Sequence, residues 1–507
     1  MKVTFDLLES PWIPCVRGDG TPAELGLREA LARAHEMREL HGESPPVTAA
    51  LHRLLLAVLH RIFGPESHKE WGTLWQAGRW DEAALDAYLD HWHGRFDLFH
   101  AERPFYQTPD DRVKPKSLAT LIQEVASGHN PTLFDHHTDS GGFAVVPSRA
   151  ARALVAAQTF GLAHPCDPSQ KLYFTDGPCA RGICFLVQGD SLFETLALNL
   201  LRYPDDTVMV HRADDQPAWE MDDPSTPGRS RPRGYLDYLT WQSRRVLFTP
   251  PPASDGLPVE EMTIAPGLRL DPDVLDPMKH YHQDEKRGPR PLPFREDRAL
   301  WRDSAALFQL WQAEYIPPRS FDWLALLVDS GYLDKSQTRR CLALGIGAYQ
   351  DRVDFYRAER MPLPLVYLQE RGVVEHVQTA LAMAETGAHQ LWGATRSLAT
   401  VLVCPGGERP ARGSEKWKRI TELTEHWAVE RRYWSRLETP FMQTVEALPR
   451  DAESTLEQWR EILLRSAREA FDHAADNLAH DPRALKAVVR ASGQLAAGLA
   501  KALPAGQ

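Results

Sequence analysis

The last third of the chain carries a helical pattern that limits what the protein can fold into. Beyond about Val373, apolar residues recur at the three- and four-residue spacing of one helix face. The predicted helices cover Glu375–Val403, Lys416–Val445, a segment that begins with the capping box Ser454-x-x-Glu457, and a segment with Asp481 as N-cap and Pro482 at the first helical position. Short connections between such helices favour an antiparallel four-helix bundle, which we assign to residues 371–507.

Residues 1–370 mix helix and strand signals in no regular order. The strongest helix signal is Thr48–Phe63, where leucines recur on one face and Gly64-Pro65 ends the pattern. Weaker helices are predicted over Leu25–Leu40, Ser148–Phe160 and Ser191–Leu201, and strands over Ile183–Val187, Thr240–Phe248 and Met262–Ile264. Because these segments follow no βαβ rhythm, we predict a large, irregular α+β domain.

Aromatic residues indicate where the core of this domain lies. Trp12 is a predicted core anchor, and the aromatic-rich stretch from Trp71 to Phe105 fits helices packed into one core. His52 and His60, on the strongest predicted helix, are expected to be half-exposed rather than metal ligands.

Composition is that of a soluble globular protein, with 43% hydrophobic and 25% charged residues. No run of eighteen or more apolar residues occurs, and the N-terminus has acids and a proline where a signal peptide has its apolar core. We therefore expect a cytoplasmic protein without membrane contact. The six cysteines form no C-x-x-C pair and are expected to be reduced and mostly buried. Phosphate-loop, nucleophile-elbow and zinc-protease motifs are lacking, so we predict no catalytic residue and no cofactor.

Net charge is -11, which at first sight argues against nucleic acid, because phosphate binding depends on Lys and Arg. The basic residues are nevertheless clustered. One cluster contains Arg229, Arg231, Arg233, Arg244 and Arg245, and a second contains Lys286, Arg287, Arg290, Arg295, Arg298 and Arg302. Each is either a local basic patch on an acidic body or an ordinary salt-bridged surface.

The stretch Ser127–Gly142 is rich in Gly, Ser, Thr, Asn and Asp and has no periodicity, which predicts a long exposed loop. Its one large ring is Phe134, preceded by Leu133. A purely solvated loop has little reason to carry such a ring, whereas a ring on a mobile loop can stack on a nucleobase or fill a partner's pocket. The alternative is a surface loop without function.

The same stretch contains His136, His137 and Asp139, which leave open a metal-dependent hydrolase. Zinc sites use four ligands at tighter spacing than this segment or Cys179-x-x-x-x-Cys184 offers. We therefore predict no metal.

Four stretches, taken together and in this order, resemble a known family. They are Phe5–Val16 (Phe-Asp-Leu-Leu-Glu-Ser-Pro-Trp-Ile-Pro-Cys-Val), Phe99–Thr108 (Phe-His-Ala-Glu-Arg-Pro-Phe-Tyr-Gln-Thr), the Phe134 loop, and Tyr238–Arg245 (Tyr-Leu-Thr-Trp-Gln-Ser-Arg-Arg). The chain resembles the CasA family, the large subunits of the type I-E CRISPR surveillance complex Cascade, over nearly its whole length. The resemblance also implies an irregular α+β domain followed by a four-helix bundle.

This resemblance implies a non-catalytic subunit that recognises the motif beside a target in double-stranded DNA, aids duplex opening and helps recruit a helicase-nuclease in antiviral defence. The implied partners are the other Cascade subunits, the guide crRNA, the double-stranded target and the helicase-nuclease. A scaffold without nucleic-acid contact is the remaining alternative.

The family's working residues map unevenly onto this chain. The aromatic residue of its first mobile loop matches Phe134 in Asn130–Asp135, and its glycine-rich loop falls near Gly161–Cys166, which has one glycine. Its lysine finger falls between Arg269 and Lys279, with no single residue fixed. Its wedge falls at Gly347–Arg352, where Gln350 keeps the amide, Asp351 follows, and Arg352 is available to share the role; the alternative there is an ordinary polar helix start. The nucleic-acid-binding residues predicted in this way are Asn130, Phe134, Gly161, Arg269, Lys279, Gln350, Asp351 and Arg352.

Overall fold

The computed structural model describes residues 3–125, 143–202, 214–226, 228–251, 258–308, 312–349, 352–406, 408–476, 478 and 482–505. The chain forms two compact units. The first comprises Met1–Glu296, Gln312–Asp334 and Arg339–Arg360, and the second comprises Asp297–Trp311, Lys335–Thr338 and Met361–Gln507. The continuous part of the helical unit thus begins ten residues before the boundary at 371, and the unit includes two shorter segments that the sequence analysis placed in the first domain.

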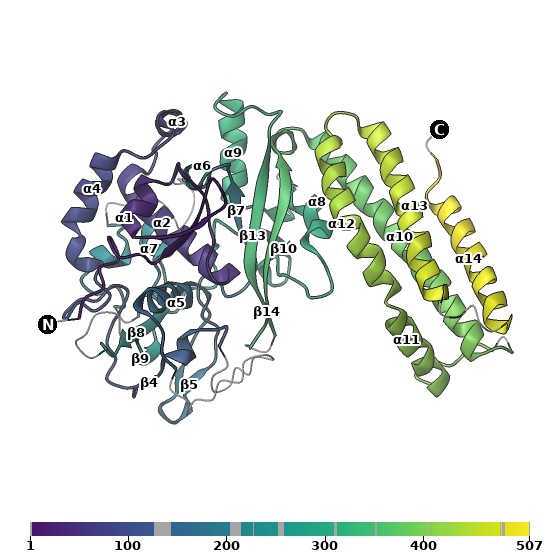
Figure 1. The fold of residues 1–507 in the computed structure, drawn as a ribbon, viewed down its shortest axis with the longest axis horizontal. Coiled ribbons are helices and arrows are strands. Elements are labelled where there is room, and N and C mark those ends of the chain that lie inside the picture. Colours follow the sequence, from purple (N-terminus) through teal and green to yellow (C-terminus); the bar gives the residue numbers. More distant parts are fainter. Residues whose placement is uncertain are drawn as a thin grey trace. The chain divides into compact units, whose positions relative to one another are not determined.

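The described strands lie mostly in the first unit and form small antiparallel sheets rather than one large sheet (Figure 1). They are β1 (Ile13–Arg17), β2 (Pro22–Leu25), β3 (Met37–Leu40), β4 (Lys116–Ser117), β5 (Pro165–Asp167), β6 (Leu172–Tyr173), β7 (Cys184–Gln188), β8 (Arg244–Phe248), β9 (Glu261–Pro266), β10 (Tyr281–Asp284), β11 (Gly288–Pro291), β12 (Tyr315–Ile316), β13 (Thr338–Tyr349) and β14 (Arg352–Pro364). The sheets have the orders β2-β1-β3, β4-β9-β8, β11-β10-β12, β14-β13-β7 and β5-β6. This mixture confirms the predicted α+β class.

Helices complete the two units. Those of the first unit are α1 (Leu27–Ala32), α2 (Pro45–Phe63), α3 (His68–Ala77), α4 (Glu82–His91), α5 (Pro147–Phe160), α6 (Leu192–Leu198), α7 (Tyr235–Leu239) and α9 (Arg319–Asp329), with the 3-10 turns η1 (His93–Arg95), η2 (Leu118–Leu121), η3 (Pro168–Gln170) and η4 (Ala218–Glu220). The second unit contains η5 (Leu300–Asp303), α8 (Ser304–Leu307), η6 (Leu365–Leu368), α10 (Arg371–Val403), α11 (Glu415–Trp427), α12 (Val429–Ala447), α13 (Ala452–Asp476) and α14 (Pro482–Ala502).

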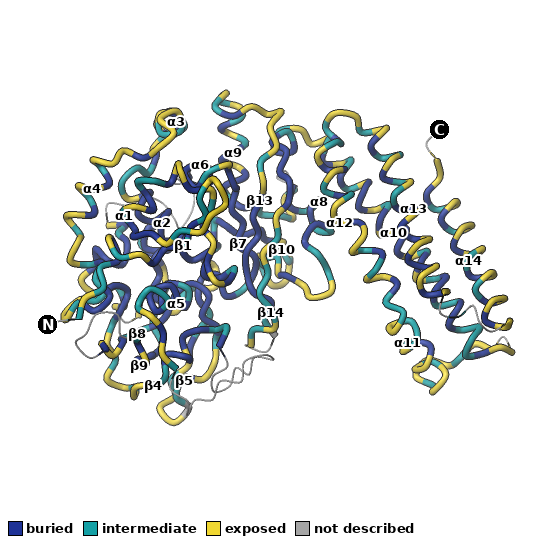
Figure 2. The backbone as a smooth tube through the Cα atoms, in the orientation of Figure 1, coloured by how far each residue is buried: buried dark blue, intermediate teal, exposed yellow. Residues whose placement is uncertain are grey.

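Helix α2, which the apolar periodicity of Thr48–Phe63 predicted, is at the centre of the first unit's core. Residues Pro46 to His60 are all buried (Figure 2). Among the described residues, α2 is the one helix long and apolar enough to cross a membrane, and 83% of its apolar window is buried inside the structure. It is therefore built as the core helix of a globular unit.

Two predictions about the first unit are wrong. His52 and His60 are buried, not half-exposed, and burial lowers the pKa of His52 to about 4 and that of His60 to about 3, so both are neutral at pH 7. The predicted helix Leu25–Leu40 is instead the short α1 followed by β3. Pairing of Cys15 in β1 with Leu40 in β3 overrides the local helix propensity.

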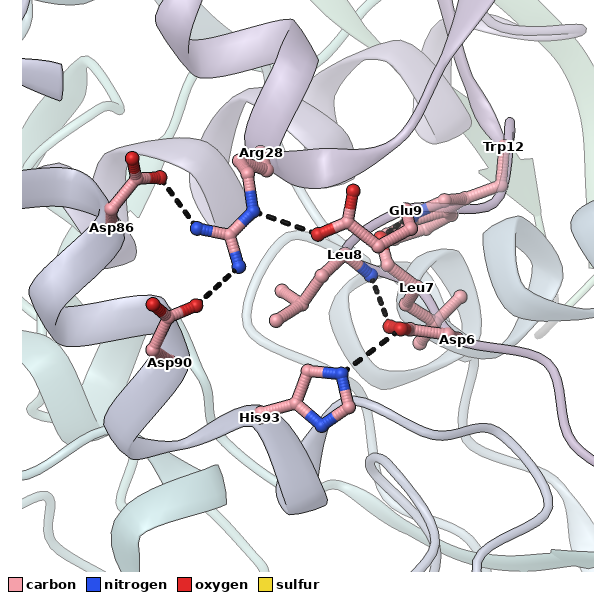
Figure 3. A network of polar contacts seen from close by, with 9 residues as sticks. All are labelled: Asp6, Leu7, Leu8, Glu9, Trp12, Arg28, Asp86, Asp90 and His93. Carbon is pink, nitrogen blue, oxygen red and sulfur yellow. Dashed lines mark hydrogen bonds and ion pairs between the residues drawn. The ribbon is translucent and has the colours of Figure 1, made fainter.

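The N-terminal motif combines buried apolar side chains with a network of polar contacts (Figure 3). Leu7 and Leu8 are buried, and the indole N–H of Trp12 donates to the Leu7 carbonyl at 2.7 Å. Outside this apolar layer, the Arg28 guanidinium contacts the carboxylates of Glu9, Asp86 and Asp90. The motif that helps to carry the family resemblance is therefore an element of the fold.

An ion pair between Arg53 and Asp276 lies in the interior, each side chain 1% exposed and the two groups 2.9 Å apart. The same carboxylate accepts from the Tyr238 hydroxyl at 2.7 Å and from the Met278 N–H at 2.8 Å. Burial alone would raise the pKa of Asp276, but Arg53, Lys279 and these hydrogen bonds outweigh it and hold the pKa below its usual value. The pair joins α2 to the segment that precedes β10.

The second unit is a helical bundle of α10, α12, α13 and α14, with the shorter α11 leading into α12 (Figure 1). The predicted single helix Lys416–Val445 is divided because Ala428 has a left-handed backbone with φ of 49°. The predicted capping box is also misplaced. Asp451, not Ser454, caps α13, since its carboxylate accepts the Ser454 N–H at 3.1 Å.

Arg53→Met should lower the stability of the first unit by about 3–5 kcal/mol at neutral pH, because it leaves Asp276 buried without its cation. The depressed carboxyl pKa stabilises the wild type above the unfolded-state pKa of about 3.9, and that contribution is lost as the pH falls through the folded-state pKa. In the variant the Asp276 pKa is raised instead, so acid relieves the unpaired charge.

Thermal melts between pH 3.5 and 8 should therefore show a difference in melting temperature between wild type and variant that becomes smaller toward acid pH. Arg33→Gln is the matched control, since Arg33 pairs on the surface with Glu29 and Glu36 and should change stability by less than about 1 kcal/mol. A gap equal at all pH values would contradict this role for Asp276.

Candidate nucleic-acid interface

The segment that contains Asn130 and Phe134 lies outside the described residues, as do His136, His137 and Asp139. Its two ends are firmly placed in the first unit. Val125, which follows η2, is 6% exposed, and Val145, which precedes α5, is 4% exposed and forms a β-bridge with Val259. The predicted loop therefore departs from and returns to the core of one unit.

The predicted wedge lies at the end of a β-hairpin. β13 ends at Tyr349 and its neighbour β14 begins at Arg352, which is exposed; Gln350 and Asp351 between them lie outside the described residues. The alternative of a polar helix start is wrong, because Arg352 begins a strand.

A glycine near this end makes room for a ring on the partner strand. A Cβ on Gly347 would lie 2.2 Å from the Phe355 ring, so any side chain there would displace that ring. The Arg357 guanidinium lies 4.8 Å from the centre of the same ring. The aromatic residue thus covers the glycine and supports the hairpin that carries Arg352.

Gly161 ends helix α5 and is buried rather than presented to solvent. A Cβ there would lie 2.5 Å from the Arg244 guanidinium. That guanidinium donates to the carbonyls of Leu162 at 2.8 Å and Thr175 at 2.8 Å, and it lies 4.7 Å from the Phe174 ring centre. Burial lowers the pKa of Arg244 to about 10, so it stays charged at pH 7. Because Gly161 has no side chain, the Arg244 guanidinium can pack directly against its backbone.

Three of the predicted segments converge. Leu162, directly after Gly161, packs with Ile346 of β13, and Val353 and Tyr356 of β14 pack against the same small core. The Gln123 amide donates to the Phe160 carbonyl at 2.9 Å, so the chain that leads into the Phe134 segment lies beside the end of α5. The wedge hairpin, the Gly161 loop and one end of the Phe134 segment therefore share one side of the first unit.

The segment Arg269–Lys279, to which the family resemblance assigns the lysine finger, is buried at one end and exposed at the other. Lys279 is 6% exposed and its ammonium donates to the Pro178 carbonyl at 2.6 Å, so it is occupied in the interior. Arg269 is exposed. Of the two candidates, only Arg269 is free to meet a ligand without unpacking the core.

The first basic cluster is not a basic patch. Arg229 pairs with the buried Asp237, Arg231 with Asp271 and Asp273, and Arg245 with Asp110. In the second cluster, Arg298 and Arg302 pair with Glu385 inside the helical unit. Lys286, Arg287, Arg290 and Arg295 remain exposed, and within the described part of the chain they have no ion-pair partner.

Other candidate sites are weaker. A cavity of about 210 Å³ lies between α2, α5 and η2, but the nearby Arg152 is already paired with Glu24 and Glu43. Among the described residues, no group of three His, Cys, Asp or Glu is placed to hold a metal. All six cysteines are free and buried, as predicted.

The sequence matches the profile of the family described as "CRISPR-associated protein Cse1" over residues 6–470. The chain belongs to the Cse1 family. The CasA/Cse1 protein of Thermus thermophilus is 33% identical, with 96% of this chain and 95% of that protein covered. The family resemblance seen in the four motifs is thereby confirmed.

Solved Cse1 structures have the same fold. The crystal structure of Thermus thermophilus CasA aligns with a TM-score of 0.81 at 29% identity, over 98% of this chain and 100% of that one. Thermobifida fusca Cse1 aligns with a TM-score of 0.81 at 26% identity, over 99% and 98%. A chain of a CRISPR RNA-guided surveillance complex aligns with a TM-score of 0.66 at 25% identity, over 97% and 98%.

Two of the four family motifs contain residues that stabilise the fold of the first unit. In Tyr238–Arg245, the Ser243 hydroxyl and the Arg244 N–H both bond to Gln158 of α5, at 2.7 and 2.8 Å. In Phe99–Thr108, Gln107 is buried and its amide donates to the Leu98 carbonyl at 2.7 Å. The residues of these family motifs thus hold the neighbouring loops in place. The sequence analysis missed the role of Arg244 in supporting the Gly161 loop, because it grouped Arg244 with surface arginines.

Gly347→Ala should loosen the wedge hairpin, since overpacking against Phe355 costs about 1–3 kcal/mol. Amide exchange at Val353 and Phe355 should rise relative to wild type, with little change in α2. Gly94→Ala is the control, because no atom lies within 4 Å of its would-be Cβ. Unchanged exchange in the hairpin would show that the Phe355 ring does not support it.

Proposed function

We propose that this Cse1 protein is the non-catalytic large subunit of a CRISPR RNA-guided surveillance complex, and that it recognises the motif beside the target in double-stranded DNA and aids duplex opening. The observation that carries the proposal is the shared core of Leu162, Ile346 and Val353. It brings together the segments that the family resemblance assigns to DNA contact. We expect no catalytic activity and no cofactor.

The proposed role suits an acidic protein. A hairpin end and a few loop residues make few phosphate contacts, so the bound RNA and neighbouring subunits must contribute much of the affinity. Exposed cations lie at Arg352 in the proposed wedge and at Arg269 in the proposed finger segment, and the β10–β11 hairpin carries a further group of them. Minor-groove recognition distinguishes A·T from T·A poorly, so we expect a tolerant motif with several accepted variants.

The proposed partners follow from the family. They are the other subunits of the complex, the guide crRNA, the target duplex and a helicase-nuclease that this subunit helps to recruit, all in the cytoplasm and as part of antiviral defence. Membrane contact is not part of the proposal, and the buried α2 supports that view.

Replacing Gln350 and Arg352 together by alanine should impair duplex opening more than DNA binding. An inserted side chain must offset an unstacking cost of a few kcal/mol per step, so its benefit is greatest on a paired target. Affinity of the assembled complex should fall on a fully paired target and recover on a target with a pre-opened bubble beside the motif.

Asp354→Ala is the control, because Asp354 is exposed on the same strand two residues beyond Arg352. Equal loss on both DNAs would mean that Gln350 and Arg352 only bind phosphate, and no loss on either would remove them from the interface.

Phe134→Ala should weaken target binding by the assembled complex by about 1–3 kcal/mol, the value of a ring stacked on one base. The melting temperature of the Phe134→Ala variant should equal that of the wild-type protein. A drop of many degrees would instead make Phe134 a core residue and refute the proposed contact.

A further inference from the structure

A short hairpin beside the Gly161 loop carries an exposed aromatic ring that the proposed function does not use. β5 and β6 pair through Pro165 and Tyr173, and Tyr173 is 55% exposed. It is the most exposed aromatic residue in the described part of the first unit. Strand alternation sends its neighbour Phe174 inward, where that ring is 4% exposed beneath Arg244.

Hydrogen bonds hold the hairpin on both strands and at its tip. The Phe174 N–H donates to the His164 carbonyl at 2.9 Å, and the Lys116 ammonium donates to the Cys166 carbonyl at 3.4 Å. At the tip, the Asp167 carboxylate accepts from the N–H of Ser169 at 3.0 Å and from its hydroxyl at 2.6 Å. A ring on such a support loses little conformational entropy when it binds a ligand.

Charge around the hairpin favours an anionic ligand. Lys171, at the tip, is exposed and has no ion-pair partner within the residues that the structure covers. Beside the hairpin, the Lys116 ammonium contacts the Cys166 carbonyl of β5, and Arg112 is paired with Asp110 at 2.6 Å. Lys116 and Lys171 outnumber the one carboxylate at the tip, that of Asp167, so the local net charge is positive.

The chain that leads into the β5–β6 hairpin packs on the same small apolar core as the wedge hairpin. Its first strand begins three residues after Leu162, which packs against Ile346 of β13 and the nearby Val353 of β14. Bases released beside the wedge would need a surface to stack on, and an aromatic ring provides one for any base sequence.

We propose that Tyr173 stacks on an unpaired base of the DNA strand opened beside the motif, with Lys171 at the adjoining phosphate. This assignment rests on the proposed function, and it adds a binding residue on a different hairpin from Arg352. The ligand it implies is single-stranded DNA of any sequence, held by ring stacking and one cation.

The test uses the assembled complex with its guide RNA and a target whose bases beside the motif are unpaired and include 2-aminopurine. Tyr173→Ala should weaken binding of this DNA about 5- to 150-fold, the equivalent of one stacked base, and should raise 2-aminopurine fluorescence in the complex. Tyr173→Phe should behave as wild type, and Tyr173→Leu, apolar but without a ring, should behave as the alanine variant. Leu326→Ala, an exposed apolar residue on α9, should change neither readout.

Wild-type affinity and fluorescence for Tyr173→Ala would overturn the assignment while leaving the proposed function intact. Failure of that variant to join the complex would also overturn it, because Tyr173 would then be a contact to a protein subunit. If the wild-type complex binds the DNA without regard to the motif, the proposed function fails, and the assignment falls with it.

Discussion

The guanidinium of Arg244 is the interaction on which the proposed interface depends. Leu162 and Thr175 lie outside the helices and strands, so their carbonyls need partners other than a helix or sheet ladder. One buried cation supplies them, bonding to Leu162 and Thr175 from the start of β8. It also occupies the space beside Gly161 and covers Phe174, so that the loop, the β5–β6 hairpin and, through Leu162, the wedge hairpin are placed by a single side chain.

Charge in this chain serves mainly its own fold. Arg53, Arg152 and Arg244 are buried, and many surface arginines are paired with acids. Among the described residues, exposed cations without an ion-pair partner include Lys171, Lys286 and Arg352 on hairpins, and Lys418, Arg465 and Lys486 on helices of the second unit. A net charge of -11 therefore does not contradict contact with DNA, because local field rather than total charge decides where a phosphate binds.

The sequence predicted elements whose signal is local and missed those fixed by distant contacts. Helices α2, α5 and α10 were found from apolar spacing and terminal glycines and prolines, because helix hydrogen bonds join near neighbours. Strand β3 was mistaken for helix because its pairing with β1 leaves no local trace. The break at Ala428 was missed because alanine favours helix, and the burial of Lys279 and Gly161 was invisible because their partners, Pro178 and Arg244, are far away in sequence. For the candidate site, the family resemblance indicated which residues to consider, and the structure showed which other residues pack against them.

The second unit is discontinuous in the chain, and this affects how it is made. Trp301, 1% exposed, has its ring 4.6 Å from that of Phe441, which the ribosome adds about 140 residues later. At synthesis rates of about 5–20 residues per second, the tryptophan waits roughly 7–28 seconds for its partner. During that interval the first unit acquires its last segment, Arg339–Arg360, and can then fold, whereas the segment around Trp301 still lacks its partner. Biogenesis of the protein thus includes a stage with an uncovered aromatic segment on a nascent chain, which is the kind of surface that chaperones bind.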